Sequence, residues 1–108
     1  MASRPESLAA GTIVISAAAT APSGVQVSGN GLGVYMLTNT GTTTAFMAAG
    51  ASASAAQSAA VIPTGTTGER VWPVLAGAAI TVTDLPDAYW SGITASGTAS
   101  VYVSPLGS

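Results

Sequence analysis

The sequence predicts an all-β fold, a single-domain antiparallel β-sandwich of jelly-roll-like type with about eight short strands. Three observations lead to this prediction. Segments rich in β-branched and aromatic residues recur at a spacing of roughly 8–12 residues. Gly, Pro, Asn and Asp separate these segments, as they do at turns. The chain of 108 residues has the length of one domain.

The first half of the chain contains four segments with strand character. The segment 12–16, TIVIS, is mostly β-branched, and the segment 25–29, VQVSG, alternates apolar and polar residues. Two further segments follow at 32–39 (LGVYMLTN) and 43–49 (TTAFMAA), and the first of them ends in a turn signal, NTG. We therefore expect four strands before residue 50.

The second half contains four more strand segments. They are 70–75 (RVWPVL), 79–84 (AITVTD), 88–95 (AYWSGITA) and 98–104 (TASVYVS). Pro73 lacks the amide hydrogen that a central strand needs, so its strand is expected at a sheet edge or with a bulge, and Trp72 at the sheet margin. Tyr89 and Trp90 point to opposite faces of a strand. We expect Trp90 to face the core.

Two pairs of neighbouring strands are expected to form β-hairpins. The run 32–49 fits a hairpin with its turn at 39–42. Ser96 and Gly97 form a two-residue connection between the last two strands, which is typical of a tight hairpin. Each pair would then lie within one sheet.

The segment 51–60, ASASAAQSAA, fits a linker, a helix or part of the sandwich. Alanine, the strongest helix former, occupies six of its ten positions, but the interspersed serines weaken an isolated helix. A linker would separate two pieces too small to close a core each. We therefore expect an edge strand or an ordered connection inside one domain. Residues 1–10 are expected to form an N-terminal arm and residues 11–108 the sandwich.

Charged residues make up only 6% of the chain, against about 25% in an average soluble domain. They are Arg4, Glu6, Glu69, Arg70, Asp84 and Asp87. Two arginines and a net charge of −2 do not make a phosphate-binding surface, so we expect no nucleic-acid partner. The chain has no His, Cys or Lys, and we expect no enzyme activity, no metal site and no cofactor.

Only Asp84 and Asp87 are carboxylates close together in the sequence. The segment 83–90, TDLPDAYW, is interpreted as a turn in which Asp84 bonds the backbone and Pro86 fixes φ. The alternatives are a weak cation site or a sugar-binding edge with Tyr89 and Trp90. The run 7–21, SLAAGTIVISAAATA, has the character of a signal-peptide core, but Pro and Glu precede it and Pro22 follows it, so we expect it to be retained. It is too short to span a membrane.

A few residues are candidates for contacts between subunits. Arg70 and Trp72 share a face if their segment is a strand, and arginine and tryptophan are common anchors of interfaces. The full set of interface candidates is Arg4, Glu6, Glu69, Arg70, Trp72 and Tyr89. A charge-poor surface of small residues also suits a protein that spends its time assembled.

The stretches GVYMLTNTGTTTAFMAAG (33–50), IPTG (62–65) and GITASGTASVYVSPLG (92–107) resemble small structural proteins of tailed bacteriophages, in particular head decoration, or cement, proteins. The resemblance spans residues 33–107. It implies a β-sandwich or jelly roll that binds the outer capsid lattice as a dimer or trimer. The implied partners are the major capsid protein and further copies of the chain. The implied location is the capsid surface of the virion, after synthesis in the host cytoplasm.

Two other functions are compatible with the composition. A carbohydrate- or receptor-binding module of a phage tail or fibre would use Trp72, Tyr89 and Trp90 as an exposed, coplanar stacking platform. An ice-binding protein would need a regular ladder of threonines, for which the chain offers only TVT (81–83) and TTT (42–44).

Overall fold

Each of the eight expected strands is present in the computed structural model, which describes residues 11–27, 33–64 and 70–106. The elements in chain order are β1 (Ile13–Ala17), β2 (Val25–Gln26), β3 (Val34–Asn39), β4 (Ala45–Gly50), α2 (Ala53–Ala59), β5 (Trp72–Val74), β6 (Ala79–Thr83), β7 (Tyr89–Ile93) and β8 (Ala99–Leu106). The alternation of apolar and polar residues that predicted the strands is therefore kept in the fold. The expected arm, residues 1–10, lies outside the described residues.

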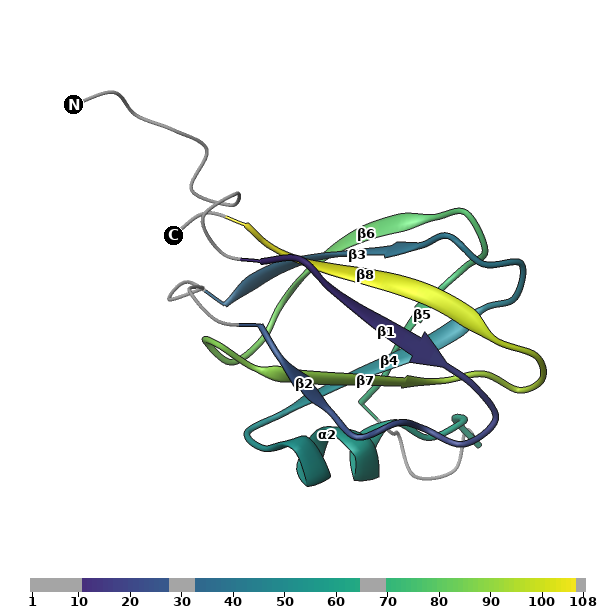
Figure 1. Ribbon diagram of the computed structural model, residues 1–108, viewed down its shortest axis with the longest axis horizontal. Helices are drawn as coiled ribbons and strands as arrows, with labels where there is room; N and C mark the ends of the chain where they lie inside the picture. The colour runs from purple at the N-terminus through teal and green to yellow at the C-terminus, as the bar shows by residue number, and fades with distance from the viewer. Residues whose placement is uncertain (1–10, 28–32, 65–69, 107–108) are drawn as a thin grey trace.

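The strands form two antiparallel sheets of four strands each (Figure 1). The first sheet has the order β1-β8-β3-β6, and the second has the order β2-β7-β4-β5. Strand β1 pairs with β8, β2 with β7, β3 with β6, and β4 with β5. This is one long two-stranded ribbon folded over itself, which is the arrangement of a jelly roll. The expected fold class is confirmed.

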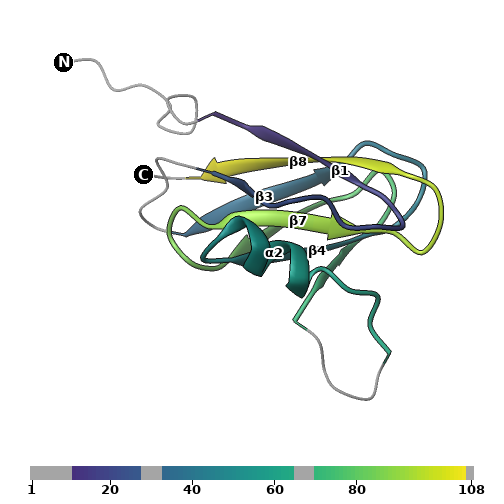
Figure 2. The ribbon, with the colours of Figure 1, turned by 60° about the horizontal axis from the view of Figure 1, so that its bottom comes forward.

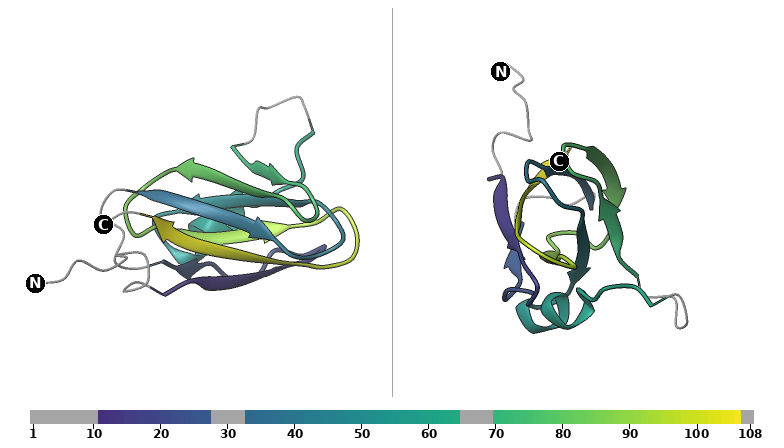
Figure 3. Two further views of the ribbon diagram at one scale, coloured as in Figure 1. Left: turned by 90° about the horizontal axis from the view of Figure 1, so that it is seen from above. Right: turned by 90° about the vertical axis from the view of Figure 1, so that its right-hand side faces the viewer.

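Both expected hairpins are wrong. Strands β3 and β4 lie in different sheets, and so do β7 and β8, so each connection crosses from one layer to the other (Figure 3). The turn signals at 39–42 and at Ser96 and Gly97 do mark reversals of the chain. A turn signal says that the chain reverses, but it does not say whether the next strand pairs with the last one or faces it across the core.

The space between the sheets is filled by the inward-facing side chains of both layers. Large members are Ile15, Tyr35, Leu37, Val101 and Val103 from the first sheet and Met47, Val74 and Trp90 from the second. Trp90 is fully buried and lies edge-on to Tyr35, with ring centroids 5.2 Å apart. The expectation that Trp90 faces the core is confirmed.

Asn39 joins the two sheets at one end of the sandwich. Its side chain is buried, and its Nδ2 donates to the carbonyl oxygens of Thr43 at 2.8 Å and Val74 at 2.9 Å. The Oδ1 of Asn39 accepts a hydrogen bond from the amide of Gly41 at 2.8 Å. One side chain of the first sheet thereby holds both the crossing to β4 and the end of β5.

The segment 51–60 contains a helix, α2. Of the two expected alternatives, the edge strand is wrong, and the ordered connection inside the domain is the one observed. Ser52 caps the helix by accepting a hydrogen bond from the amide of Ala55 at 3.1 Å. Helix α2 packs on β4 and β7, on the side of the second sheet that points away from the core (Figure 2). A helix this short is marginal alone, and its packing on the sheet stabilises it.

Two glycines allow α2 to approach the sheet closely. A Cβ placed on Gly50 would lie 2.7 Å from the backbone nitrogen of Ala56, and one on Gly24 would lie 2.9 Å from the carbonyl oxygen of Ala53. The amide of Gly24 also donates to that carbonyl at 3.1 Å. Only glycine at these two positions leaves room for the helix backbone.

Strand β5 is at the edge of the second sheet, as Pro73 predicts. Pro73 is opposite Phe46 of β4, and an edge strand tolerates proline because it is paired on one side only. The second sheet therefore ends at a strand that a further strand cannot extend regularly.

Candidate interaction surface

Three of the six candidate interface residues, Arg4, Glu6 and Glu69, lie outside the described residues. The other three are Arg70, Trp72 and Tyr89. The guanidinium of Arg70 lies over the Trp72 ring, 5.8 Å from its centroid, so these two residues do come together. Tyr89 does not join them. It precedes the inward-facing Trp90 with the opposite orientation on β7, whereas Trp72 is level with the buried, inward-facing Met47.

Arg70 already has a partner within its own chain. Its Nη2 lies 3.3 Å from Oδ2 of Asp84, just beyond the end of β6. The arginine side chain is 79% exposed and the Asp84 side chain is 9% exposed, and an ion pair whose cation is this open to solvent adds about 1 kcal/mol or less to stability. The pair fixes the position of Arg70 beside Trp72 more than it stabilises the fold.

Trp72 is partly a core residue. Its ring lies 5.3 Å from the ring of Trp90 at an angle of 44°, and it packs against the main core cluster while remaining half-buried. The sequence alone indicates an anchor at the sheet margin whose loss would affect assembly more than folding. The contact with Trp90 changes that expectation, because removing the Trp72 ring uncovers part of the core.

The three aromatic residues do not form a stacking platform. Trp90 is fully buried, the Trp72 ring is tilted against it, and Tyr89 points to the other face of the sheet. The buried indole nitrogen Nε1 of Trp90 has no hydrogen-bond partner in the part of the chain that the structure describes. A sugar-binding site built from these three rings, or from the edge of Tyr89 and Trp90, is excluded by this arrangement.

The segment between β6 and β7 is a turn, as its sequence predicts. Oδ1 of Asp84 accepts a hydrogen bond from the amide of Leu85 at 2.7 Å. The Tyr35 hydroxyl donates to the carbonyl of Leu85 and accepts from the amide of Ala88 at 2.8 Å. Asp87 has a left-handed backbone, with φ of 51°. Burial raises the pKa of the Tyr35 hydroxyl above its ordinary value, because the charged phenolate would lose its hydration.

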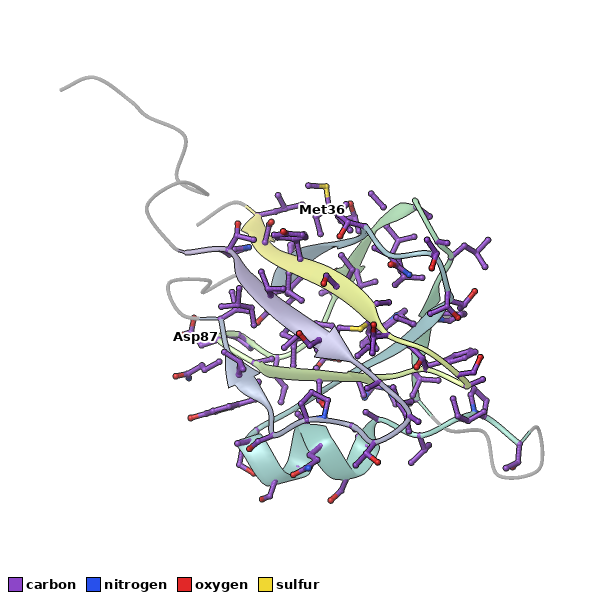
Figure 4. The ribbon with its side chains drawn as sticks, turned by 45° about the vertical axis from the view of Figure 1, so that its right-hand side comes forward. Met36 and Asp87 are labelled. Carbon is purple, nitrogen blue, oxygen red and sulfur yellow. The ribbon has the colours of Figure 1, made fainter. Side chains whose placement is uncertain are left out.

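The charges of the described residues gather at this turn. They are Arg70, Asp84 and Asp87, and Figure 4 shows Asp87 at this end of the sandwich and Met36 at the first sheet, pointing away from the core. Across the described ranges, no three acidic, His or Cys side chains gather into a group that could hold a metal ion. The sheet faces are consequently free of charge.

The outer surface of the first sheet carries no charge, and no other part of the described chain covers it; we call this surface the outer face. Residues that are level on neighbouring strands share a face of the sheet, and one such row is Val14, Tyr102, Thr38 and Ala79. The outer face consists of Val14, Ser16, Val34, Met36, Thr38, Ala79, Thr81, Thr83, Ser100, Tyr102, Ser104 and Leu106. Val14 is 46% exposed and Tyr102 is 40% exposed.

The outer side of the second sheet is different, because other parts of the chain cover it. Ala48 and Ser91 point outward from β4 and β7, yet both are fully buried. Helix α2 and the segment 18–24 lie over them, with Ser91 Oγ donating to the carbonyl of Pro22 at 2.7 Å and Gln57 Nε2 donating to that of Ala21 at 2.9 Å. Among the described residues, the two middle strands of the second sheet are therefore covered on their outer side, whereas the first sheet is not covered.

The residue types on the outer face gave no signal by themselves. The sequence-based prediction selected Arg70 and Trp72 because arginine and tryptophan are common at interfaces, whereas the outer face is made of Val, Leu, Met, Ala, Ser, Thr and one tyrosine. The alternation ASVYVS in β8 separates an inward set from an outward one. The strand order was needed to place the outward residues of four separate segments side by side.

No protein-family model matches this chain, and no curated protein or solved structure shows significant similarity to it. In the described ranges, no helix is both long enough and apolar enough to cross a lipid bilayer.

Proposed function

We propose that this chain is a non-enzymatic structural protein that decorates the outside of a tailed-phage capsid and braces its lattice by binding the major capsid protein through the outer face of the first sheet. One observation carries the proposal. The outer face is a four-stranded sheet surface without charge and without a covering element among the described residues, on a sandwich whose opposite side is closed by α2.

The chemistry of the outer face limits the kind of partner it can bind. It combines apolar side chains such as Val14 and Met36 with the hydroxyls of serines and threonines. Such a surface offers shape, apolar contact and neutral hydrogen bonds, but no charge that would steer a charged ligand. A flat protein surface with matching apolar and neutral polar groups is the partner that fits.

The size of the face favours many weak contacts over one strong contact. Four strands about 4.8 Å apart and five residues long cover about 300 Å² in projection, against about 800 Å² per partner in a typical stable complex. A capsid lattice repeats the same docking position many times, so weak contacts become effective when several copies are linked. Decoration of a lattice suits a small face of this kind.

The resemblance to decoration proteins adds support from the sequence. The stretches that carry it include β3 and β8, the two central strands of the first sheet. The rival proposal of a carbohydrate-binding module loses the aromatic platform on which it was based, since Trp90 is buried.

The proposal is tested by co-sedimentation with phage heads assembled without the chain. We expect wild-type protein to pellet with the heads up to a fixed number of copies. The variant Tyr102→Lys places a charge on the outer face and is expected to abolish pelleting. The control Ser58→Lys places the same charge on the exposed side of α2 and is expected to bind normally. Wild-type protein that stays in the supernatant, or equal binding by both variants, contradicts the proposal.

A further inference from the structure

Among the described strands, the edge of β6 is the least protected of the four sheet edges against the addition of another strand. Proteins usually protect an edge with a proline, a charge, a bulge or a very short strand. Strand β5 contains Pro73, and β2 has two residues. Strand β1, IVISA, also lacks charge and proline, but it lies against β2 and β7 of the other sheet and leads at Ala18 into a bridge with Ile93. Strand β6, AITVT, is a regular five-residue strand without charge or proline.

The hydrogen-bond register shows which backbone groups of β6 face the open side. The amide of Asp84 donates to the carbonyl of Gly33 at 2.8 Å, and the amide of Asn39 donates to that of Ala78 at 2.9 Å. Hydrogen-bonded pairs alternate along an antiparallel ladder. The intervening bonded positions are therefore Ile80 and Val82, opposite Leu37 and Tyr35.

Ala79, Thr81 and Thr83 accordingly direct their amide and carbonyl groups away from β3. Among the described strands, β6 has a neighbour on one side only. These three residues, every second one along β6, thus present a row of backbone donors and acceptors at the open edge. Such a row is a template for an added strand.

We propose that β6 pairs with β6 of a second copy of the chain, antiparallel and centred on Thr81, so that the first sheets of two copies join into one continuous eight-stranded sheet. In this register Thr81 is opposite Thr81 of the second copy, and Ala79 is opposite Thr83. All of these are residues whose backbone groups face the open edge, so each can form a bonded pair. A shift of the register by one residue would put bonded positions opposite residues that are already bonded to β3.

The side chains agree with this register as well. Ile80 of one copy is level with Val82 of the other on the core side, which places two β-branched residues side by side and covers the half-buried Ile80. Threonine pairs across antiparallel strands are favourable, and no like charges meet within the strand. The occupant that fits the edge of β6 is therefore another β6.

The pairing has a consequence for the outer face. Paired residues of an antiparallel sheet share a face, so the outer faces of both copies point the same way. The docking surface of about 300 Å² becomes about 600 Å², closer to that of a stable complex. The pairing is argued from β6 alone and does not rest on the proposed capsid partner. Its test uses the isolated chain, so either proposal can fail without the other.

The experiment is sedimentation equilibrium of the purified chain over a wide range of concentrations. We expect a reversible monomer–dimer equilibrium for the wild type. Thr81 is exposed on the outer face, so Thr81→Lys and Thr81→Glu are expected to keep the fold, which circular dichroism checks. Each variant alone is expected to dimerise about tenfold more weakly or worse, because two like charges meet directly across the pair.

Mixing the two charge variants gives the decisive result. An equimolar mixture of Thr81→Lys and Thr81→Glu is expected to recover a heterodimer, because opposite charges then meet at the centre of the pair. The control Ser16→Lys adds a charge at the opposite edge of the same sheet, on β1, and is expected to dimerise like the wild type. A wild type that remains monomeric at every concentration, or a Thr81→Lys variant that dimerises normally, overturns the proposal. Loss of the dimer in Ser16→Lys alone would overturn it too, because the contact would then belong to β1.

Discussion

Replacing Asn39 by alanine is expected to destabilise the sandwich strongly, because this one buried side chain ties the two sheets together. The Asn39 side chain makes three hydrogen bonds, to Thr43, Val74 and Gly41, at 2.8, 2.9 and 2.8 Å. Alanine removes all three bonds and leaves their partners buried or partly buried without a replacement. The link between β3 and the end of the second sheet is lost at the same time.

The size of the effect follows from those three partners. A buried polar group left without a hydrogen bond costs about 1–3 kcal/mol. The Val74 carbonyl is in the buried part of the site, and the other two groups are partly buried and can regain some hydration. We expect a loss of about 3–5 kcal/mol, out of a total of about 5–15 kcal/mol for a domain of this size. The melting temperature should fall by about 15 °C or more.

Urea unfolding followed by circular dichroism measures the loss. The control Thr40→Ala removes an exposed hydrogen bond from the neighbouring residue to the carbonyl of Ser100 at 3.0 Å, and it should cost less than about 1 kcal/mol. Asn39→Asp keeps the shape but faces two carbonyl oxygens, so the protonated carboxyl is preferred and its pKa is raised. Its stability should be highest below about pH 4 and fall as the pH rises. Equal costs for Asn39→Ala and Thr40→Ala would refute this role of Asn39.

Three further results are expected from the packing. Burial raises the pKa of Tyr35, so its contribution to stability is complete below about pH 10 and is lost as the pH rises through the raised pKa. In urea unfolding, Tyr35→Phe should therefore show a smaller loss of stability at alkaline pH. At pH 7 the variant should cost about 1–3 kcal/mol, since the amide of Ala88 loses its acceptor. Gly50→Ala should cost about 1–3 kcal/mol by pushing α2 off the sheet, whereas Gly11→Ala, with nothing within 4 Å of the new Cβ, should be neutral in the same assay. Similar losses of stability in the two variants would show that close packing of α2 at Gly50 is unimportant. Trp72→Ala should lower the free energy of unfolding by about 2–3 kcal/mol, and an unchanged value would show that the contact with Trp90 is unimportant.

The strands and their inward faces could be predicted from the sequence because their signal is local. A period of two residues separates core from surface in strands such as β1, β3 and β8, and alternation along β7 assigned Trp90 correctly. Pro73 likewise carries its own reason for lying at an edge. These predictions need no knowledge of which segments meet in space.

The topology could not be predicted in the same way. The turns at 39–42 and at Ser96 and Gly97 look like hairpin turns, but each of them crosses between layers. What decides the crossing at Asn39 is a set of hydrogen bonds to Thr43 and Val74, and the partner Val74 lies 35 residues away. Helix α2 is a similar case, because its stability depends on Gly24 and the sheet beneath it.

The candidate surface depends on the topology and therefore escaped prediction. Arg70 and Trp72 stand out in the sequence because their residue types are common at interfaces, and in the structure they contact Asp84 and Trp90 of the same chain. The outer face has no residue type that attracts attention by itself. It can be recognised only once the strand order is known, because that order brings uncharged residues of β1, β8, β3 and β6 together.

A cryo-electron microscopy map of heads decorated with the wild-type chain tests the proposed function most directly. We expect one jelly roll at each decorated position, with the outer face of the first sheet against the shell and α2 pointing to solvent. Heads that carry no added density after incubation, or density with α2 against the shell and the outer face exposed, would contradict the proposal.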